Sequence, residues 1–264
     1  GGEMRLAEAF RRRPLLIAYI CAGDPSPEAT VEVAELLARA GADVVELGLP
    51  HSDPIADGPV IQAAAQRAIE AGMNTDVYFE TASRIRAKIP LVFMGYYNMI
   101  YQRGLEKFAG DCGASGITAI IVPDLPPEEA GPLRAACRRA DLDLISLIAP
   151  NTPAERIPLI AENSSGFLYL VARAGVTGAR SEVLQSTKAL IERVNSELPR
   201  AVGFGISTPE QAAEVIRAGA DAAIVGSACV DLISKGDLAG LEELIRGMKA
   251  AIGEARPIEA AARI

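Results

Sequence analysis

The chain has 264 residues, of which 50% are hydrophobic and 23% charged, and its net charge is −8. A chain this apolar can bury a large core, which excludes wholesale disorder, and its length suits one large α/β domain. The excess of acidic residues, with no cluster of Lys and Arg, offers no positive surface for nucleic acid or anionic lipid, so neither is expected as a partner. The single histidine nearly excludes a histidine-based metal centre or a Ser-His-Asp triad, because each needs that imidazole in the right place.

The cysteines lie far apart and show no C-x-x-C spacing. They are Cys21, Cys112, Cys137 and Cys229. This usage favours small buried thiols in a reducing cytoplasm over disulfides. Three arginines at 11–13 before the apolar run 15–22 imitate a signal peptide, but the run is short and interrupted, and no cleavage site follows. No run approaches the roughly 18 apolar residues of a membrane span, so a cytoplasmic location is expected.

Short apolar runs alternate with longer amphipathic stretches along the whole chain. The runs predicted as strands are 15–22, 43–49, 91–97, 116–122, 142–149, 166–172, 201–206 and 222–225. They are continuously apolar, which is typical of parallel strands covered on both faces. The stretches predicted as helices include 3–12, 27–40, 59–71, 127–140, 181–198 and 209–218. Three Ser/Thr-Pro pairs, at Ser26, Thr152 and Thr208, predict N-caps followed by proline in the first turn.

This repeated strand–helix pattern predicts an α/β protein with a single domain over residues 1–264. Eight strand–helix units in this length favour a (β/α)8 barrel, or TIM barrel, with an additional N-terminal helix. The alternative is a doubly wound open sheet, but no G-x-G-x-x-G follows the first strand.

A match between two segments of the sequence draws attention to one unusual carboxyl group. Residues 39–48 match residues 217–226 in frame, and each segment joins a helix end and a glycine to a strand. At one position of this frame the eighth strand has Ile224, whereas the second has Glu46. A carboxylate in an apolar strand must be paired, neutralised or functional. We favour function over a structural ion pair, because Glu46 is predicted toward the C-terminal end of a barrel strand, where active sites form.

The loop that follows Glu46 carries a second candidate. Asp57 could reach back over the mouth of the barrel, and two carboxyl groups in different environments can take different protonation roles. The alternative is that Asp57 only caps the next helix. His51, Asp53 and Asp57 would make a poor metal site by themselves, so no metal is predicted.

Glycines cluster after the sixth, seventh and eighth predicted strands, at 173–178, 203–207 and 226–227. Glycine lets backbone N–H groups approach an anion, and a short helix beginning near Ser227 would point its N-terminus at it. Barrel phosphate sites use these loops, so a phosphorylated substrate is expected. The tyrosines at 96, 97 and 101 are interpreted as packing residues, whereas Tyr169 could cover the pocket near Glu46.

With these residues in place, the sequence resembles the α subunit of tryptophan synthase over nearly its whole length. The motifs that carry the resemblance are 22–25, 46–59, 94–98, 123–126, 149–152, 173–178 and 203–206. The resemblance implies a (β/α)8 barrel that cleaves indole-3-glycerol phosphate to indole and glyceraldehyde 3-phosphate. It also implies a β subunit in an α2β2 tetramer, which receives the indole through a tunnel. No cofactor is expected in this chain, and pyridoxal phosphate is expected only in the β subunit.

The resemblance also implies roles for individual residues. Glu46 would be the acid/base that protonates the indole ring carbon, and Asp57 would accept the indole N–H and stabilise charge on the ring. The substrate pocket would include Tyr19, Tyr169, Phe204 and Thr177, the last in a closing loop. The phosphate would be held by Gly178, Gly205, Gly226 and Ser227. The interface with the β subunit would include Asp53, Pro54, Asp124 and Pro126.

Three positions depart from the pattern of this family. His51 stands where many relatives have Phe, Met99 where Pro is common, and Cys21 where Thr is frequent. None of these removes a proposed catalytic group. Two alternatives remain: another phosphate-binding barrel enzyme, such as a sugar-phosphate isomerase, and a non-catalytic barrel that regulates a β subunit.

Overall fold

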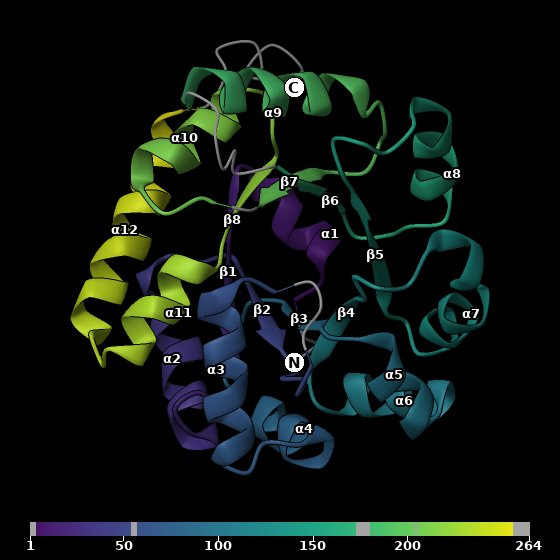
Figure 1. Ribbon diagram of the computed structural model, residues 1–264, viewed down its shortest axis with the longest axis vertical. Coiled ribbons are helices and arrows are strands. Elements are labelled where there is room, and N and C mark those ends of the chain that lie inside the picture. Colours follow the sequence, from purple (N-terminus) through teal and green to yellow (C-terminus); the bar gives the residue numbers. More distant parts are fainter. Residues whose placement is uncertain (1–3, 54–56, 173–179, 204, 256–264) are drawn as a thin grey trace.

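The computed structural model describes residues 4–53, 57–172, 180–203 and 205–255. Within these residues, parallel strands close into a barrel in chain order, with β8 paired to β1 (Figure 1). The strands are β1 Leu15–Cys21, β2 Val44–Gly48, β3 Leu91–Met94, β4 Ile117–Ile121, β5 Asp143–Ile148, β6 Leu168–Val171, β7 Arg200–Gly203 and β8 Ala222–Val225. The predicted (β/α)8 barrel is therefore confirmed; that residues 1–264 form one domain stays a prediction.

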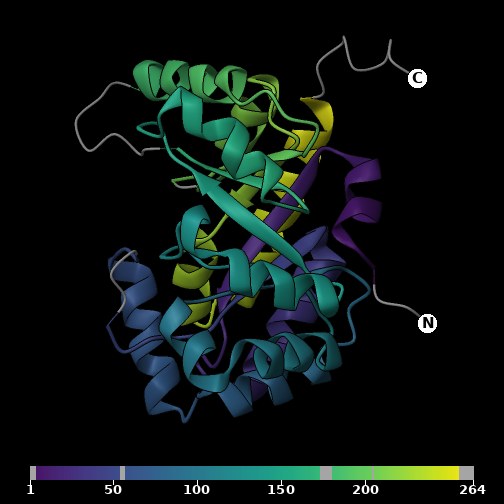
Figure 2. The same ribbon diagram turned by 90° about the vertical axis from the view of Figure 1, so that its right-hand side faces the viewer.

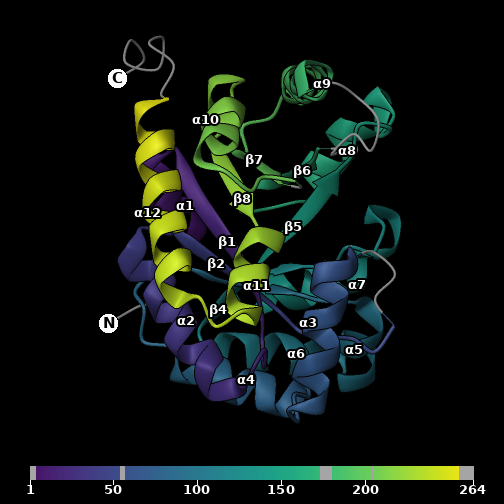
Figure 3. The ribbon, with the colours of Figure 1, turned by 60° about the vertical axis from the view of Figure 1, so that its left-hand side comes forward.

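Helices surround the barrel (Figure 1). They are α1 Leu6–Ala9, η1 Phe10–Arg12, α2 Pro27–Ala40, α3 Pro59–Glu70, α4 Thr75–Arg84, α5 Tyr97–Arg103, α6 Leu105–Ala114, η2 Pro127–Glu129, α7 Gly131–Arg139, η3 Ala154–Arg156, α8 Ile157–Glu162, α9 Arg180–Arg193, α10 Pro209–Arg217, α11 Ser227–Ser234 and α12 Leu238–Glu254. The last helix, α12, packs against α10, α11 and α2, so the end of the described chain closes the ring next to its beginning (Figure 3). None of the described helices is long and apolar enough to span a membrane.

Two predicted strands end three residues earlier in the structure than expected, and five others differ from their expected bounds by one or two residues. The third was expected over 91–97 but ends at Met94, because the Tyr97 N–H is held by the Asp124 carboxylate at 2.9 Å and begins helix α5. The seventh was expected over 201–206 but ends at Gly203, and Gly205 follows with a φ of +74° that a strand does not use. The predicted helix over 127–140 is divided into η2 and α7 at Ala130.

Two of the three predicted helix caps are confirmed. Ser26 Oγ accepts the Ala29 N–H at 3.1 Å, and Thr208 forms a reciprocal capping box with Gln211. The prediction for Thr152 is wrong. Its hydroxyl accepts the Ala149 N–H at 2.9 Å, which tightens the loop after β5 and leaves no cap for η3.

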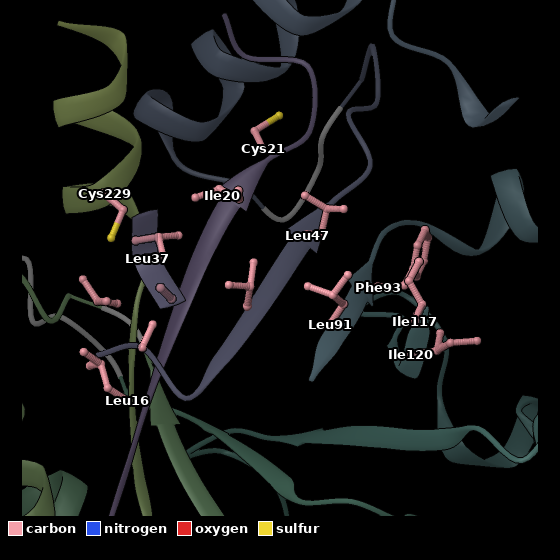
Figure 4. Packing of buried hydrophobic residues seen from close by; sticks show 14 of the residues in the cluster. Leu16, Ile20, Cys21, Leu37, Leu47, Leu91, Phe93, Ile117, Ile120 and Cys229 are labelled. Atoms are coloured by element: carbon pink, nitrogen blue, oxygen red, sulfur yellow. The ribbon is translucent and has the colours of Figure 1, made fainter. Parts of the chain in front are cut away.

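The apolar side chains form two layers, as a barrel requires. One lies between the strands and the helices, where Figure 4 shows Leu16, Ile20, Leu47 and Phe93 from the strands and Leu37 from α2. The other fills the barrel interior. Figure 2 shows α1 beside the end where the strands begin, and side chains of α1 and η1 pack into this inner layer. The loops that follow the strands lie at the opposite end, where the strands terminate.

The cysteines are all free and buried, as expected. Burial raises the pKa of Cys21, Cys137 and Cys229 to about 12 each. These thiols are therefore protonated at neutral pH, which makes them packing residues instead of nucleophiles.

Candidate active site

Strand β2 carries Glu46 into the barrel. Its side chain is only 1% exposed, and in the strand register it lies between Tyr19 of β1 and Val92 of β3. Neither carboxyl oxygen of Glu46 has a hydrogen-bond partner among the described residues. The alternative of a structural ion pair therefore finds no support in this part of the chain. The sequence match between residues 39–48 and 217–226 also holds in the structure, because Ile224 of β8 faces the same interior as Glu46.

Burial raises the pKa of Glu46 from 4.5 to about 8. The cause is the loss of water around the charged form, for which no hydrogen-bond partner among the described residues compensates. A carboxyl group that titrates near neutral pH can both donate and accept a proton under working conditions. The geometry thus gives Glu46 the property that an acid/base catalyst needs.

This shift links folding to pH. The unfolded chain ionises Glu46 near pH 4.5, whereas the folded chain retains the proton up to about pH 8. The contribution of Glu46 to the free energy of unfolding is therefore fully present below pH 4.5 and is lost as the pH rises to about 8.

We expect the free energy of unfolding of Glu46→Gln to rise relative to that of the wild type across this pH window, by a few kcal/mol in all. Urea unfolding of both proteins at pH 5, 6, 7 and 8 tests this, and a constant difference would contradict it.

Two tyrosines flank Glu46. Tyr19 lies directly opposite it on β1, and Tyr169 faces the interior from β6. Burial first, and the Glu46 charge in addition, raises the pKa of both phenols well above 10.0. Two glycines make room for these rings, because a Cβ at Gly48 would collide with the Tyr19 hydroxyl and one at Gly203 with that of Tyr169. The role of Gly48 was missed in the sequence.

Asp57 lies at the mouth, two residues before α3. Helix α3 has Gly58 as its N-cap and no side-chain cap, so the interpretation of Asp57 as a cap is wrong. The Asp57 carbonyl instead accepts the Gln62 side chain at 2.7 Å, and its half-buried carboxylate accepts the Tyr96 hydroxyl. Burial raises the pKa of Asp57, while the Tyr96 hydrogen bond and the nearby His51 lower it.

Glu46 and Asp57 both affect the pKa of Tyr19. The Tyr19 pKa is raised chiefly by burial and also by the charges of both carboxyl groups, which places them around the same phenol. The two environments nevertheless differ. Glu46 has no polar partner among the described residues, whereas Asp57 has a hydrogen-bond donor and a histidine beside it. This difference suits one carboxyl group that exchanges a proton and another that stays ionised.

The predicted phosphate loops lie next to each other, because β7 pairs with β8. Gly226 is the N-cap of α11, and the exposed Ser227 is its first residue, as predicted. The first turn of α11 has neither a side-chain cap nor an acidic residue, so its N–H groups can receive an anion. Gly205 follows β7 with positive φ. Gly178, Thr177 and Phe204 lie outside the described residues.

The predicted partner-facing residues are exposed where they are described. Asp53, Asp124 and Pro126 lie on the surface, and Pro54 is outside the described residues. Asp124 also has a structural role, since it holds the first N–H of α5. A cavity of 280 Å³ lies between loop 122–127 and β5. Within the described residues, no group of His, Cys, Asp and Glu is arranged to hold a metal ion.

An ion pair behind the site, between a buried carboxylate and a partly exposed arginine, was missed in the sequence. Arg67 of α3 forms a two-pronged contact with Asp24, with N–O distances of 2.9 and 3.0 Å, and Asp24 is 4% exposed. The neighbouring Gly23 N–H is held by Thr30 at 2.9 Å. The Asp24–Arg67 contact fastens the loop after β1 to α3, the helix that follows Asp57, and the Thr30 contact fastens the same loop to α2. Sequence spacing could not find the ion pair, because Asp24 and Arg67 are far apart along the chain.

Comparisons with known proteins agree with this geometry. A model of the family "Tryptophan synthase alpha chain" matches residues 6–261. The chain is 49% identical over 258 residues to the tryptophan synthase alpha chain of Methanosarcina acetivorans, covering 95% of each chain. It is 52% identical over 260 residues to that of Methanosarcina barkeri, covering 96% of this chain and 99% of the relative.

Solved structures lead to the same family. A tryptophan synthase structure from Mycobacterium tuberculosis superposes with a TM-score of 0.87 at 36% identity, covering 95% of this chain and 98% of the other. The α2β2 tryptophan synthase complex of Pyrococcus furiosus gives a TM-score of 0.85 at 35% identity, with 90% and 98% covered. The fold, the carboxyl group inside the barrel and these matches lead to one conclusion: the chain belongs to the tryptophan synthase alpha chain family.

Proposed function

We propose that this chain cleaves indole-3-glycerol phosphate to indole and glyceraldehyde 3-phosphate, with Glu46 and Asp57 as its catalytic groups. The chain is a carbon–carbon lyase of tryptophan biosynthesis, since that is the reaction of its family. The observation that supports the assignment of residues most directly is the buried carboxyl group of Glu46, which has no polar partner among the described residues.

The chemistry requires two proton movements. Indole leaves readily only after its C3 carbon is protonated, and the adjacent glycerol hydroxyl must lose its proton as the carbon–carbon bond breaks and the aldehyde forms. A group with a pKa of about 8 holds a proton to give to C3 at neutral pH. Once it has given that proton, its carboxylate can accept the hydroxyl proton. We therefore assign both transfers to Glu46.

Asp57 would stabilise the charge that this protonation creates. Protonation at C3 makes the indole ring cationic, and the ring N–H becomes a stronger hydrogen-bond donor. An ionised carboxylate at the mouth can accept that N–H and lower the energy of the cation. The Tyr96 hydrogen bond and His51 favour the ionised form of Asp57, although burial opposes it. Tyr19 and Tyr169 would form walls of the indole pocket, with Phe204 and Thr177 in the remaining loops.

The phosphate group would bind at the N-terminus of α11. Gly226 and Ser227 begin this helix, and Gly205 lies in the loop after the neighbouring strand. We propose that backbone N–H groups of these residues, together with Gly178, hold the phosphate oxygens. This binding would fix the glycerol end of the substrate, so that the indole ring reaches Glu46.

A β subunit is the proposed partner, in an α2β2 assembly that passes indole between subunits. The related Pyrococcus furiosus protein forms an α2β2 complex. The exposed residues Asp53, Asp124 and Pro126, with Pro54, are proposed to face the β subunit. Pyridoxal phosphate is proposed to belong to that subunit and not to this chain. A cytoplasmic location is proposed because the thiols are reduced and buried.

Release of indole tests this function directly. We expect slow turnover of indole-3-glycerol phosphate by the chain alone and faster turnover with its β subunit. Asp57→Asn should lower kcat by roughly 10²–10³-fold with little change in substrate affinity, because it removes charge that acts mainly in the transition state. Absence of indole under both conditions would favour a non-catalytic regulator. Turnover of a sugar phosphate but not of the indolyl substrate would favour another barrel enzyme.

A further inference from the structure

A second layer of contacts surrounds Asp57. The Tyr96 hydroxyl donates a hydrogen bond to its carboxylate, and Tyr96 is only 7% exposed. The His51 ring lies against Tyr96, with centroids 5.2 Å apart and planes tilted by 56°. The Asp53 N–H in turn donates to His51 Nδ1 at 3.0 Å. The imidazole is therefore held in place on both sides, by an aromatic ring and by its own loop.

We propose that Tyr96 and His51 are positioning residues for Asp57: the hydroxyl orients the carboxylate, and the imidazole ring holds Tyr96 in place. This inference rests on the proposed role of Asp57. An aromatic residue at position 51 would preserve the ring contact with Tyr96, whereas a small residue would remove it.

The hydrogen bond to His51 fixes the orientation of its ring. Nδ1 accepts the Asp53 N–H, and this contact ties the imidazole to the backbone of its own loop. The ring therefore offers a fixed surface against which Tyr96 packs.

The titratable groups that face Asp57 come from three parts of the described chain. From β1 they are Tyr19 and Cys21, whose pKa values are raised chiefly by burial and to a lesser degree by nearby charges that include Asp57. Tyr96 follows β3, and His51 belongs to the loop of Asp57 itself. Among these described neighbours, Tyr96 is the one that donates a hydrogen bond to the Asp57 carboxylate.

Two substitutions separate the hydroxyl from the ring contact. Tyr96→Phe removes the hydrogen bond but retains the ring, and His51→Ala removes the ring that packs against Tyr96. Tyr101→Phe is the matched control, because Tyr101 is 68% exposed on α5 and belongs to no part of the proposed site. Indole release by the chain with its β subunit is measured from pH 5 to 9, with kcat and KM determined separately and unfolding midpoints recorded.

We expect Tyr96→Phe to lower kcat about tenfold and to move the acid limb of its pH profile up by about one unit. His51→Ala should move the limb in the same direction by roughly half a unit, because the Tyr96 hydroxyl is then less well held, and His51→Phe, which retains an aromatic contact, should restore the wild-type limb. Tyr101→Phe should do neither. A purely structural role would lower the unfolding midpoint and scale the rate equally at every pH, and unchanged acid limbs in Tyr96→Phe and His51→Ala would overturn the proposal.

The outcome is distinguishable from failure of the proposed function. If Asp57→Asn retains the wild-type rate, Asp57 is not catalytic, and the proposed function is wrong at that residue. If Asp57→Asn is inactive while Tyr96→Phe and His51→Ala both keep the wild-type acid limb, only the positioning role is wrong.

Discussion

Glu46→Gln is expected to reduce kcat for indole release by about 10³-fold, the middle of the range for a lost acid/base catalyst. Glutamine has nearly the shape of protonated glutamate, so the barrel interior should accept it without rearrangement. It can neither give a proton to C3 nor take one from the glycerol hydroxyl. Because Glu46 touches the reaction and not the phosphate, affinity for a non-cleavable indolyl-alkyl phosphate should remain within a few-fold of wild type.

A matched control separates loss of a catalytic group from loss of charge alone. Glu80→Gln makes the same change on the exposed face of α4 and should retain the wild-type rate. Stopped-assay measurement of indole gives kcat, and calorimetric titration with the non-cleavable ligand gives affinity. A Glu46→Gln variant with a rate close to wild type would show that the buried carboxyl group is structural. The gain in stability expected at pH 8 guards against misfolding as an explanation for an inactive variant.

Ser227→Asp is expected to weaken substrate binding by at least about 100-fold while leaving the fold intact. Two negative groups about 5 Å apart repel by roughly 3 kcal/mol for each pair of unit charges near a protein surface, and a phosphate carries up to two charges. The same aspartate lies at the N-terminus of α11, which has no side-chain cap, so it should stabilise that helix by about 0.3–1 kcal/mol. Binding and stability should therefore change in opposite directions.

The neutral variant Ser227→Asn controls for size at this position. It places a side chain of the same volume at the helix N-terminus without charge, and its KM should lie within about tenfold of wild type. Steady-state KM and thermal unfolding of both variants are the measurements. An unchanged KM in Ser227→Asp would locate the phosphate elsewhere and leave the glycines of these loops as turn residues.

Much of the barrel followed from local patterns. The apolar runs predicted every strand of the described barrel, and β8 matches its predicted bounds. Errors arose where a tertiary contact decided the end of an element. Asp124, from the loop after the next strand, starts α5 and so shortens β3. Thr152 had a typical capping sequence, but its hydroxyl accepts the Ala149 N–H within its own loop instead. In both cases competition for one hydrogen bond overrode the local preference.

The candidate site shows the same division. Glu46 was found because a carboxyl group in an apolar strand is conspicuous in the sequence, and Asp57 because it lies in a distinctive loop. Tyr96 was interpreted as packing, and its contact with Asp57 was missed. The Asp24–Arg67 pair was missed as well. Neither has a spacing signal, since each joins residues from different strand–helix units.

The sequence by itself determined that this chain would form eight strand–helix units and place one carboxyl group inside an apolar strand. Periodicity and composition are local properties, so each strand–helix unit can be recognised from its own residues. The tertiary structure decided that Glu46 has no polar partner among the described residues and that Tyr19 and Tyr169 flank it. These facts depend on the register in which the barrel closes, because closure brings β6 and β2 to opposite walls of one interior. The pKa that suits Glu46 to acid/base chemistry comes from that closure, which removes water from its surroundings.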